Sequence, residues 1–389
     1  MRTLHGAPAR KGGPALSEPE PKLEIRPAES GAGPGGAYAP RLDRMAMALA
    51  LGGAGGWAAS LLNLPLAWMI GAMLATTVGS VGGLPLAMSM RVRAVMVAVL
   101  GVMLGSAFTP EILGRMAEWS LSLAALALYA ATAGGAAWLY FHRICGYDRV
   151  TSYFAAMPGG LSEMVIVGTE MGGDTRIISL SHSARLLLVV LLLPFGFQFF
   201  LGYDPAAKPA IGLPLGLMSG PDLAILAACG VIGFLLAKAI RLPAAPVVGP
   251  MILSAAVHLA GWSEARPPFE LVAAAQVVVG SAIGCRFAGT PLKLIGRAVA
   301  ASLGSTAILL AVNVAFAAAL FAMLGLPTTA LMLAYAPGGL AEMSLIAIAI
   351  GTDAAFVATH HIVRIFLIVV FAPLAFRLLA RGAKRSPET

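Results

Sequence analysis

Two sets of ionisable residues recur at one fixed spacing in otherwise apolar sequence. Each set has a glutamate three residues after a Pro-Gly-Gly triplet, followed further on by a histidine and an arginine that are three residues apart. Positions 163 and 342, 182 and 361, and 185 and 364 are each 179 residues apart. Such an ungapped recurrence of rare polar residues indicates a shared role. The two sets are Glu163, His182 and Arg185, and Glu342, His361 and Arg364.

The Pro-Gly-Gly triplets predict a break in each helix that contains one. Proline removes a hydrogen-bond donor and clashes with the preceding turn, and each glycine costs about 1 kcal/mol in a helix interior. A break leaves free backbone N–H groups at the start of the next half-helix, where they carry partial positive charge and suit an anion. A kink that only improves packing is the alternative. The predicted helix-breaking residues are Pro158, Gly159 and Gly160, and Pro337, Gly338 and Gly339.

Ionisable side chains inside a membrane are costly and typically mark pathways, partners or relays. Glu163 and Glu342 fall in the first turn of their half-helices, so each either balances the helix dipole or binds a proton or cation. Because an unpaired buried arginine is unfavourable, we expect Arg185 and Arg364 to meet these glutamates. The pairs would form either a structural clamp or a substrate- or ion-binding site. Histidine titrates near neutral pH, so the two histidines permit proton coupling without requiring it.

The remaining polar residues indicate neither a metal centre nor a catalytic site. Asp174 and Asp353 directly precede predicted helices, where an N-cap is the favoured interpretation and an ion site the alternative. The three cysteines and six histidines are too scattered for a disulfide framework or a metal cluster. The sequence has no nucleophile elbow, zinc-protease or phosphate-loop motif. We therefore expect no enzyme activity and no cofactor.

The composition requires that helices within a membrane position these residues. The 389-residue chain is 59% hydrophobic and 11% charged, whereas soluble domains carry about 25% charged residues. Residues 45–90 and 298–341 contain no charged side chain. A spanning helix needs about 20 mainly apolar residues, so each stretch can hold two spans. This excludes a soluble enzyme, a nucleic-acid-binding domain and a disordered protein for most of the chain, and predicts an all-α polytopic membrane protein.

The repeated residues divide the chain into two membrane repeats with a linker and two tails. In each half we count five ordinary spans and one segment that is broken or re-entrant at Pro-Gly-Gly. If the broken segment gives no net crossing, each half crosses an odd number of times and the second is inverted relative to the first. The predicted domains are a disordered cytoplasmic tail (1–44), repeat 1 (45–201), a linker (202–221), repeat 2 (222–379) and a cytoplasmic tail (380–389).

The distribution of basic residues supports this inverted arrangement. Cytoplasmic loops are rich in Lys and Arg, so the loop bases of both halves and both termini are predicted to lie inside. The bases predicted to lie outside are Arg115, Arg266 and the lysine of the linker. Inverted repeats with broken helices are typical of secondary transporters.

The doubled motif resembles that of the bacterial AbrB-duplication membrane proteins. The resemblance rests on P-G-G-L-[SA]-E-M followed by D, H and R, and covers about residues 45–379. Members are labelled membrane regulators of gene expression or ammonia monooxygenases, although this chain shows neither a DNA-binding element nor a monooxygenase metal site. The family shares only a name with the small DNA-binding AbrB regulators. At the level of fold, the doubled layout is similar to cation/proton antiporters and anion transporters, which is an analogy.

These observations favour a secondary transporter of the inner membrane for a small, anionic solute, coupled to protons or cations. Glu163 and Glu342 would carry the coupling, and Arg185 and Arg364 would hold the anion. The expected partners are the lipid bilayer and a small molecule or ion, with no nucleic acid, and a homo-oligomer is left open. The alternative is a membrane regulator that acts through a partner protein, and a third, less supported, is the monooxygenase of the family label.

Overall fold

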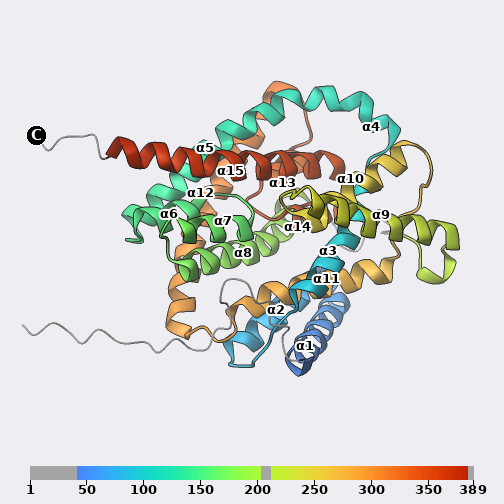
Figure 1. The fold of residues 1–389 in the computed structure, drawn as a ribbon, viewed down its shortest axis with the longest axis horizontal. Coiled ribbons are helices and arrows are strands. Elements are labelled where there is room, and N and C mark those ends of the chain that lie inside the picture. Colours follow the sequence, from blue (N-terminus) through green and yellow to red (C-terminus); the bar gives the residue numbers. More distant parts are fainter. Residues whose placement is uncertain (1–41, 203–211, 384–389) are drawn as a thin grey trace, which may run out of the picture. The chain divides into compact units, whose positions relative to one another are not determined.

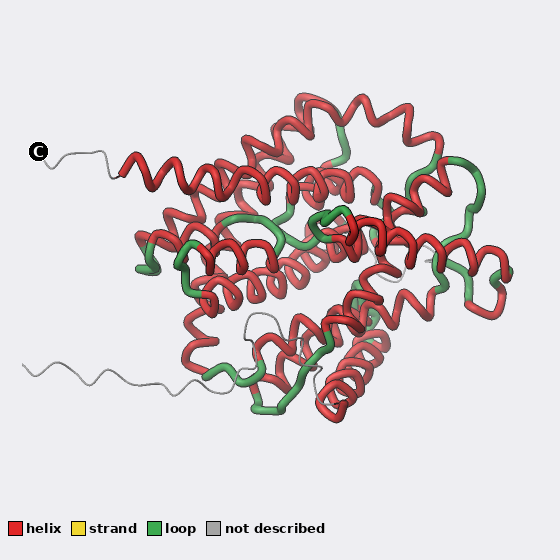
Figure 2. Tube along the Cα trace, viewed as in Figure 1, coloured by secondary structure: helices red, strands yellow, loops and turns green. Residues whose placement is uncertain are grey.

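A computed structural model describes residues 42–202 and 212–383, and all of the regular structure in these ranges is helical (Figures 1 and 2). The predicted all-α fold is therefore confirmed for the described part of the chain. Nearly all of the predicted N-terminal tail, residues 203–211 of the linker and the last six residues lie outside the described ranges.

Eight helices and one 3-10 turn lie between residues 42 and 202. Two of them, α6 and α7, flank the first Pro-Gly-Gly triplet. In chain order the elements are α1 (Leu42–Leu61), α2 (Ala67–Val81), α3 (Met90–Gly105), α4 (Pro110–Arg115), the 3-10 turn η1 (Met116–Trp119), α5 (Ser120–Arg143), α6 (Arg149–Ala156), α7 (Leu161–Glu170) and α8 (Thr175–Leu201).

The helices after the linker occur in a matching order, and α13 and α14 flank the second triplet. The last helix, α15, continues past position 379. The elements are η2 (Leu215–Leu217), α9 (Gly220–Ala239), α10 (Ala245–Leu259), α11 (Phe269–Gly284), η3 (Cys285–Phe287), α12 (Leu292–Leu324), α13 (Thr328–Tyr335), α14 (Leu340–Ala349) and α15 (Ala354–Ala383).

Six helical segments of the described ranges are long and apolar enough to cross a membrane. The chain is therefore a multi-pass membrane protein. By contrast, α2 and α10 are apolar but have only 15 residues each. At 1.5 Å per residue each is about 22 Å long, shorter than a bilayer core of about 30 Å. The six segments are Met116–Arg143, Thr175–Phe200, Gly220–Ala239, Phe269–Phe287, Leu292–Leu324 and Ala354–Leu378.

The helices pack in two groups, each of which contains elements from both halves of the chain (Figure 1). In the first, which we call the scaffold group, α1, α2 and α3 pack with α9, α10 and α11. In the second, the break group, α5–α8 pack with α12–α15, and these are the elements that contain the Pro-Gly-Gly segments. The hydrophobic core extends through both groups.

Glycines let the helices of the scaffold group approach closely. A Cβ atom at Gly101 of α3 would collide with the carbonyl oxygen of Val247 in α10, and one at Gly280 of α11 would collide with that of Met69 in α2. Backbone atoms cannot move aside as flexible side chains can, so these contacts fix α3 against α10 and α11 against α2. Gly101 lies in the C-terminal half of α3 and Val247 lies near the start of α10, so the start of α10 packs against the C-terminal half of α3.

Both predicted helix breaks are present in the backbone. The chain is non-helical from Met157 to Gly160, between α6 and α7, and from Ala336 to Gly339, between α13 and α14. Gly160 and Gly339 are the N-cap residues of the second half-helices and have extended backbone conformations. Each break exposes the C-terminal carbonyls of one half-helix and the N-terminal amides of the next.

Candidate functional site

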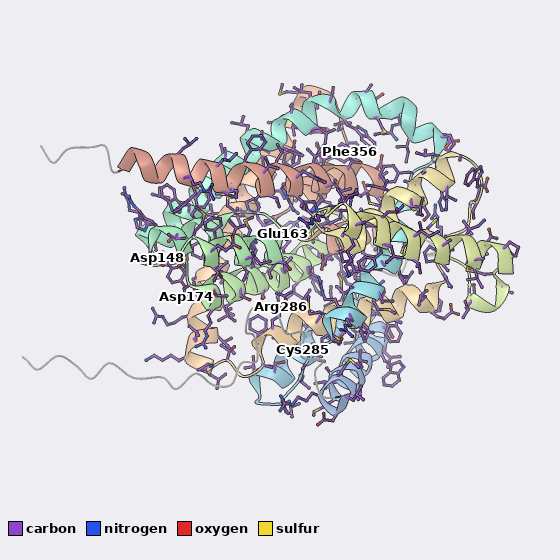
Figure 3. The ribbon with its side chains drawn as sticks, in the orientation of Figure 1. Asp148, Glu163, Asp174, Cys285, Arg286 and Phe356 are labelled. Carbon is purple, nitrogen blue, oxygen red and sulfur yellow. The ribbon has the colours of Figure 1, made fainter. Side chains whose placement is uncertain are left out.

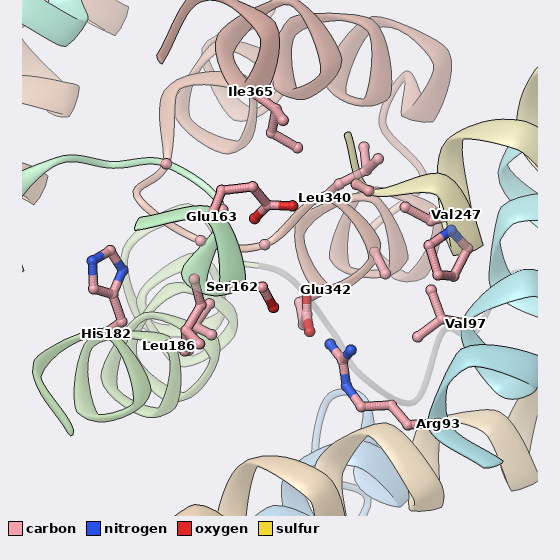
Figure 4. A pocket seen from close by; sticks show the side chains of 18 of the residues that line it. Arg93, Val97, Ser162, Glu163, His182, Leu186, Val247, Leu340, Glu342 and Ile365 are labelled. Atoms are coloured by element: carbon pink, nitrogen blue, oxygen red, sulfur yellow. The ribbon is translucent and has the colours of Figure 1, made fainter. Parts of the chain in front are cut away.

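A cavity of about 430 Å³ lies where both helix breaks face the scaffold group. Its size is in the usual range for small-molecule sites. The break group contributes α7, α8, α14, α15 and the Pro-Gly-Gly loops, and the scaffold group contributes the N-terminal part of α3, the end of α11 with η3, and the α9–α10 connection (Figure 4). Of the sequence-predicted residues, the cavity lining includes Gly159, Gly160, Glu163, His182, Arg185, Pro337, Gly338, Gly339, Glu342 and Arg364.

The two glutamates occupy the same position at the two breaks. Each folds back over its own N-cap glycine, because a Cβ atom at Gly160 or Gly339 would collide with the carboxylate of Glu163 or Glu342, respectively. A larger residue at Gly160 or Gly339 would displace the glutamate from this position. Glu342 is 5% exposed and Glu163 is partly buried. Each glutamate lies in the first turn of a half-helix, where the helix dipole has its positive end.

The arginines bind the opposite ends of the broken helices. The Arg185 guanidinium donates to the carbonyl oxygens of Ala155, Ala156 and Met157 at 3.3, 3.4 and 3.2 Å, at the C-terminus of α6. Its side chain is 4% exposed. The expected partnership between Arg185 and a glutamate is therefore wrong, and no ion pair of this residue is present within residues 42–202 and 212–383. The last carbonyls of a helix lack intrahelical partners and carry partial negative charge, so they can replace a carboxylate.

Arg364 repeats this arrangement at the second break. It donates to the carbonyl oxygens of Tyr335, Ala336 and Gly338, at the C-terminus of α13, with 2.8 Å to Gly338. The side chain is 2% exposed. The expected carboxylate partner is wrong here as well, for the same reason. Both arginines thus act as C-terminal caps of half-helices that end within the membrane protein.

The paired histidines are fixed between these arginines and the first half-helices. His182 Nε2 lies 2.8 Å from the carbonyl oxygen of Phe154, and its Nδ1 lies 2.7 Å from a guanidinium nitrogen of Arg185. His361 makes the same contacts with Leu333 and Arg364, at 2.9 and 3.0 Å. A carbonyl only accepts and a guanidinium only donates, so each ring is neutral with its proton on Nε2. Taking up a second proton would break the bond to the arginine, so the geometry favours a positioning role for both rings.

Two further arginines in the cavity were not singled out by the sequence. Arg93 on α3 and Arg286 in η3 line it and are partly buried. Arg286, which follows Cys285 after the end of α11 (Figure 3), interacts electrostatically with both Arg93 and Glu342. Arg93 extends toward Glu342 (Figure 4). From the sequence, both bases were interpreted as part of the cytoplasmic loops. Their positions have no counterpart in the other half, where Val272 and Ala107 occur, so the repeat gave no signal for them.

The two aspartates cap helices outside this cavity. Asp174 accepts hydrogen bonds from the backbone N–H groups of Arg176 and Ile177 at 2.8 and 3.0 Å, at the start of α8. Asp353 accepts one from Phe356 at 2.9 Å, at the start of α15. Asp353 also lines a second cavity of about 390 Å³, near the C-terminal ends of α3 and α14, together with Arg115 and Arg266.

These features define a class, the multi-pass α-helical membrane proteins that have a charged cavity at paired helix breaks. Residues 68–380 match the family described as transition state regulatory protein AbrB, and the chain belongs to this family. It is 27% identical over 368 residues to "Uncharacterized protein YhjN" of Bacillus subtilis, covering 88% of this chain and 95% of that protein. It is also 27% identical over 332 residues to "Putative regulator AbrB" of Escherichia coli, covering 84% of this chain and 93% of that protein.

Proposed function

We propose that the protein is a secondary transporter of a small anionic solute, coupled to protons or cations, and that it acts without a cofactor and not as an enzyme. The observation that carries the proposal is the cavity at the two breaks, which is lined by one glutamate from each break and by two arginines from the scaffold group. Ionisable groups within the membrane-spanning part of a protein typically belong to transport pathways. Discontinuous helices that meet at one site are the usual architecture of secondary transporters.

A second cavity on the far side of α14 supports a path across the protein. The first cavity contacts the N-terminal ends of α3 and α14, and the second contacts their C-terminal ends. Between them, Met343, Leu345 and Ile346 of α14 are at most 1% exposed. The path is thus closed by tightly packed side chains, as expected for a transporter whose site opens to one side at a time.

Matching geometry in the two halves supports inverted repeats. Helices α6, α7 and α8 begin at 149, 161 and 175, and α13, α14 and α15 begin 179 residues later at 328, 340 and 354. The arginine and histidine contacts at the two breaks are also equivalent. Together with the placement of the basic loops, this favours an inner-membrane protein with both termini in the cytoplasm. The larger cavity would then open inward.

The coupling ion would bind at the break glutamates. Glu163 and Glu342 face the cavity, and no hydrogen bond or ion pair occupies either carboxylate in the described part of the chain. Each can therefore exchange a proton or bind a cation as the solute enters and leaves. The histidines are less suited to this role because both of their nitrogens are already engaged.

Transport can be measured as currents from proteoliposomes on a solid-supported membrane. Concentration jumps of small carboxylates and inorganic oxyanions, with and without a pH gradient, should give a current for at least one of them. Glu342→Gln and Glu163→Gln should each abolish the coupled current, because the exchangeable carboxylate is lost, while the protein still elutes as a folded species from gel filtration. Wild-type currents in both variants would contradict the assignment of the glutamates. The absence of any current across the panel would contradict the transporter proposal.

The name of the Escherichia coli relative favours a second candidate, a membrane regulator that acts through a partner protein. The basic tails are the available docking segments in the sequence. Removing residues 1–40 separates the two ideas: the transport current should survive, whereas regulation through this tail would be lost.

A further inference from the structure

We infer that Arg93 and Arg286 form the subsite for a small divalent anion, such as a dicarboxylate or an inorganic dianion. This inference rests on the proposed transport function and deepens it, because it assigns the solute's charge and the residues that bind it. The subsite differs from the one expected from the sequence, which placed the anion on Arg185 and Arg364.

The charge balance of the cavity leaves two positive charges unmatched. The cavity lining carries four arginines and two glutamates, and the partial charges of the two helix C-termini are offset by those of the two N-termini. The two histidines are neutral in their observed hydrogen bonds. The lining therefore carries a net charge of +2, and Arg93 and Arg286 are the two arginines that bind no backbone carbonyl of the described residues. A solute with two negative charges would make the cavity neutral, whereas a monovalent anion would leave one buried positive charge.

The hydrogen bonding of the four arginines leads to the same assignment. Arg185 and Arg364 each bind three carbonyls and a histidine, which leaves little donor capacity for a ligand. By contrast, Arg93 and Arg286 make no hydrogen bond or ion pair within the described ranges. The Nε atoms of Arg93, Arg185 and Arg364 are all buried without a partner, so the difference between the two pairs lies in their terminal N–H groups. Burying a guanidinium group without acceptors for its N–H groups is unfavourable. A ligand whose oxygens accept hydrogen bonds from these groups would therefore be stabilised in the cavity.

The chemistry of the two side chains matches a carboxylate or a tetrahedral oxyanion. Guanidinium groups present parallel N–H donors that bind such groups in a bidentate manner. The two arginines are close enough to interact electrostatically. Two like charges repel each other, and a dianion between them would be attracted to both.

Glu342 would compete with this anion for the two arginines. Arg93 extends toward it, and Arg286 interacts with it electrostatically (Figure 4). An anion between the arginines therefore meets the negative charge of Glu342. Removing that charge should strengthen anion binding, even though the same substitution is expected to abolish coupled transport.

Binding to the detergent-purified full-length chain tests the subsite directly. Isothermal titration and ligand-dependent thermal unfolding would use sulfate and succinate as divalent probes and acetate as the monovalent control, at constant ionic strength and pH 8. We expect a divalent probe to bind at least about tenfold more tightly than acetate. Arg93→Gln and Arg286→Gln should each weaken this binding at least about tenfold, the loss of one charge-assisted contact. Glu342→Gln should tighten it.

Arg91→Gln is the matched control, because Arg91 lies two residues from Arg93 on the same helix but is exposed and outside the cavity lining. Its affinity should equal that of the wild type. If Arg93→Gln does not fold, Arg93→Lys keeps the charge without the bidentate geometry and should show an intermediate loss. Preference for sulfate or for succinate would identify an inorganic or an organic solute, respectively.

The subsite is overturned if neither divalent probe binds, if acetate binds as tightly, or if the Arg93 and Arg286 variants keep wild-type affinity. These outcomes are separable from failure of the proposed function. Divalent binding that depends on both arginines but gives no transport current would contradict the transporter alone. A transport current with unchanged binding in the arginine variants would contradict the subsite alone.

Discussion

Arg185 and Arg364 place their guanidinium groups against the ends of half-helices that stop inside the protein. A helix that ends in a membrane leaves its last carbonyls without water, and each unsatisfied buried acceptor costs about 1–3 kcal/mol. One arginine satisfies three of them and also balances the negative end of the helix dipole. The carbonyls at the end of the broken helix therefore stabilise the buried arginine, and the arginine in turn satisfies these carbonyls.

Replacing either capping arginine should destabilise the fold. Arg185→Met and Arg364→Met keep most of the side-chain volume but leave the carbonyls of α6 or α13 unsatisfied. We expect each to reduce the free energy of unfolding by about 2 kcal/mol or more. The measurement is the melting temperature of the purified protein in detergent.

Arg286→Met is the matched comparison for this prediction, because it removes a cavity arginine that has no carbonyl partner in the described residues. It should lower the melting temperature much less, or raise it, since an unpaired cation is removed. Equal losses for Arg286→Met and the capping variants would show that the carbonyl contacts carry no special stabilisation.

The sequence predicted most of the charged residues of the candidate site but not all of their contact partners. Glu163 and Arg185 were found because charges are rare in apolar repeats. The partner of Arg185 could not be predicted, because the acceptors are backbone atoms that any sequence carries. Arg93 and Arg286 were missed because a base near the end of a predicted span is usually a topological signal, and only packing shows that both face a shared cavity.

The scaffold group depends on backbone-to-backbone contact between its helices. At Gly101 and Gly280 a side chain would meet a carbonyl oxygen of the neighbouring helix. Small residues at helix contacts are typical of membrane proteins, where close packing replaces the hydrophobic effect between helices. Because α3 carries Arg93 and Gly101, the same contact also sets the position of the anion subsite.

Gly101→Val and Gly280→Val should therefore lower the melting temperature. Overpacking of this kind costs about 1–3 kcal/mol, and the clashing atoms belong to helix backbones that cannot rotate away. Gly296→Ala on α12 is the control, since a Cβ atom there would meet nothing within 4 Å. It should be neutral or slightly stabilising, because glycine costs about 1 kcal/mol relative to alanine in a helix. Unchanged melting of both valine variants would contradict the close approach.

The positions of the elements were more predictable than their lengths. Pro-Gly-Gly predicted both breaks because its effect on a helix is local. Residues 45–90 contain no charged side chain and were predicted to hold two spans, whereas the second helix of this stretch, α2, covers only Ala67–Val81. The chain adopts a left-handed backbone conformation at Leu66 and at Ala244, before α2 and α10. Composition does not report such turns, and they shorten both helices.

For the whole molecule, the two halves contribute equally to the breaks and unequally to the cavity. Each half supplies one glutamate, one capping arginine and one histidine at equivalent positions. Arg93 comes from the first half and Arg286 from the second, at positions that are not equivalent. The proposed repeats would therefore hold an asymmetric site, as expected if one solute binds at a time.

The proposed inversion of the second half relative to the first can be checked by cysteine labelling. The native Cys145, Cys229 and Cys285 are first replaced by serine. Single cysteines are then introduced at the exposed positions Glu264 and Lys293 of the second half, and intact cells are treated with a membrane-impermeant maleimide. Inverted repeats place Glu264→Cys outside, where it should react, and Lys293→Cys inside, where it should react only after the cells are permeabilised.

In the first half, Glu118→Cys and Arg143→Cys provide the reference, since both positions are exposed and are predicted outside and inside, respectively. If both halves had the same orientation, the second half would reverse its pattern: Lys293→Cys would react in intact cells and Glu264→Cys would not. That result would also move the loop bases of the second half to the outside, against the usual distribution of Lys and Arg. The pair of second-half cysteines therefore decides between the two orientations without knowledge of the solute.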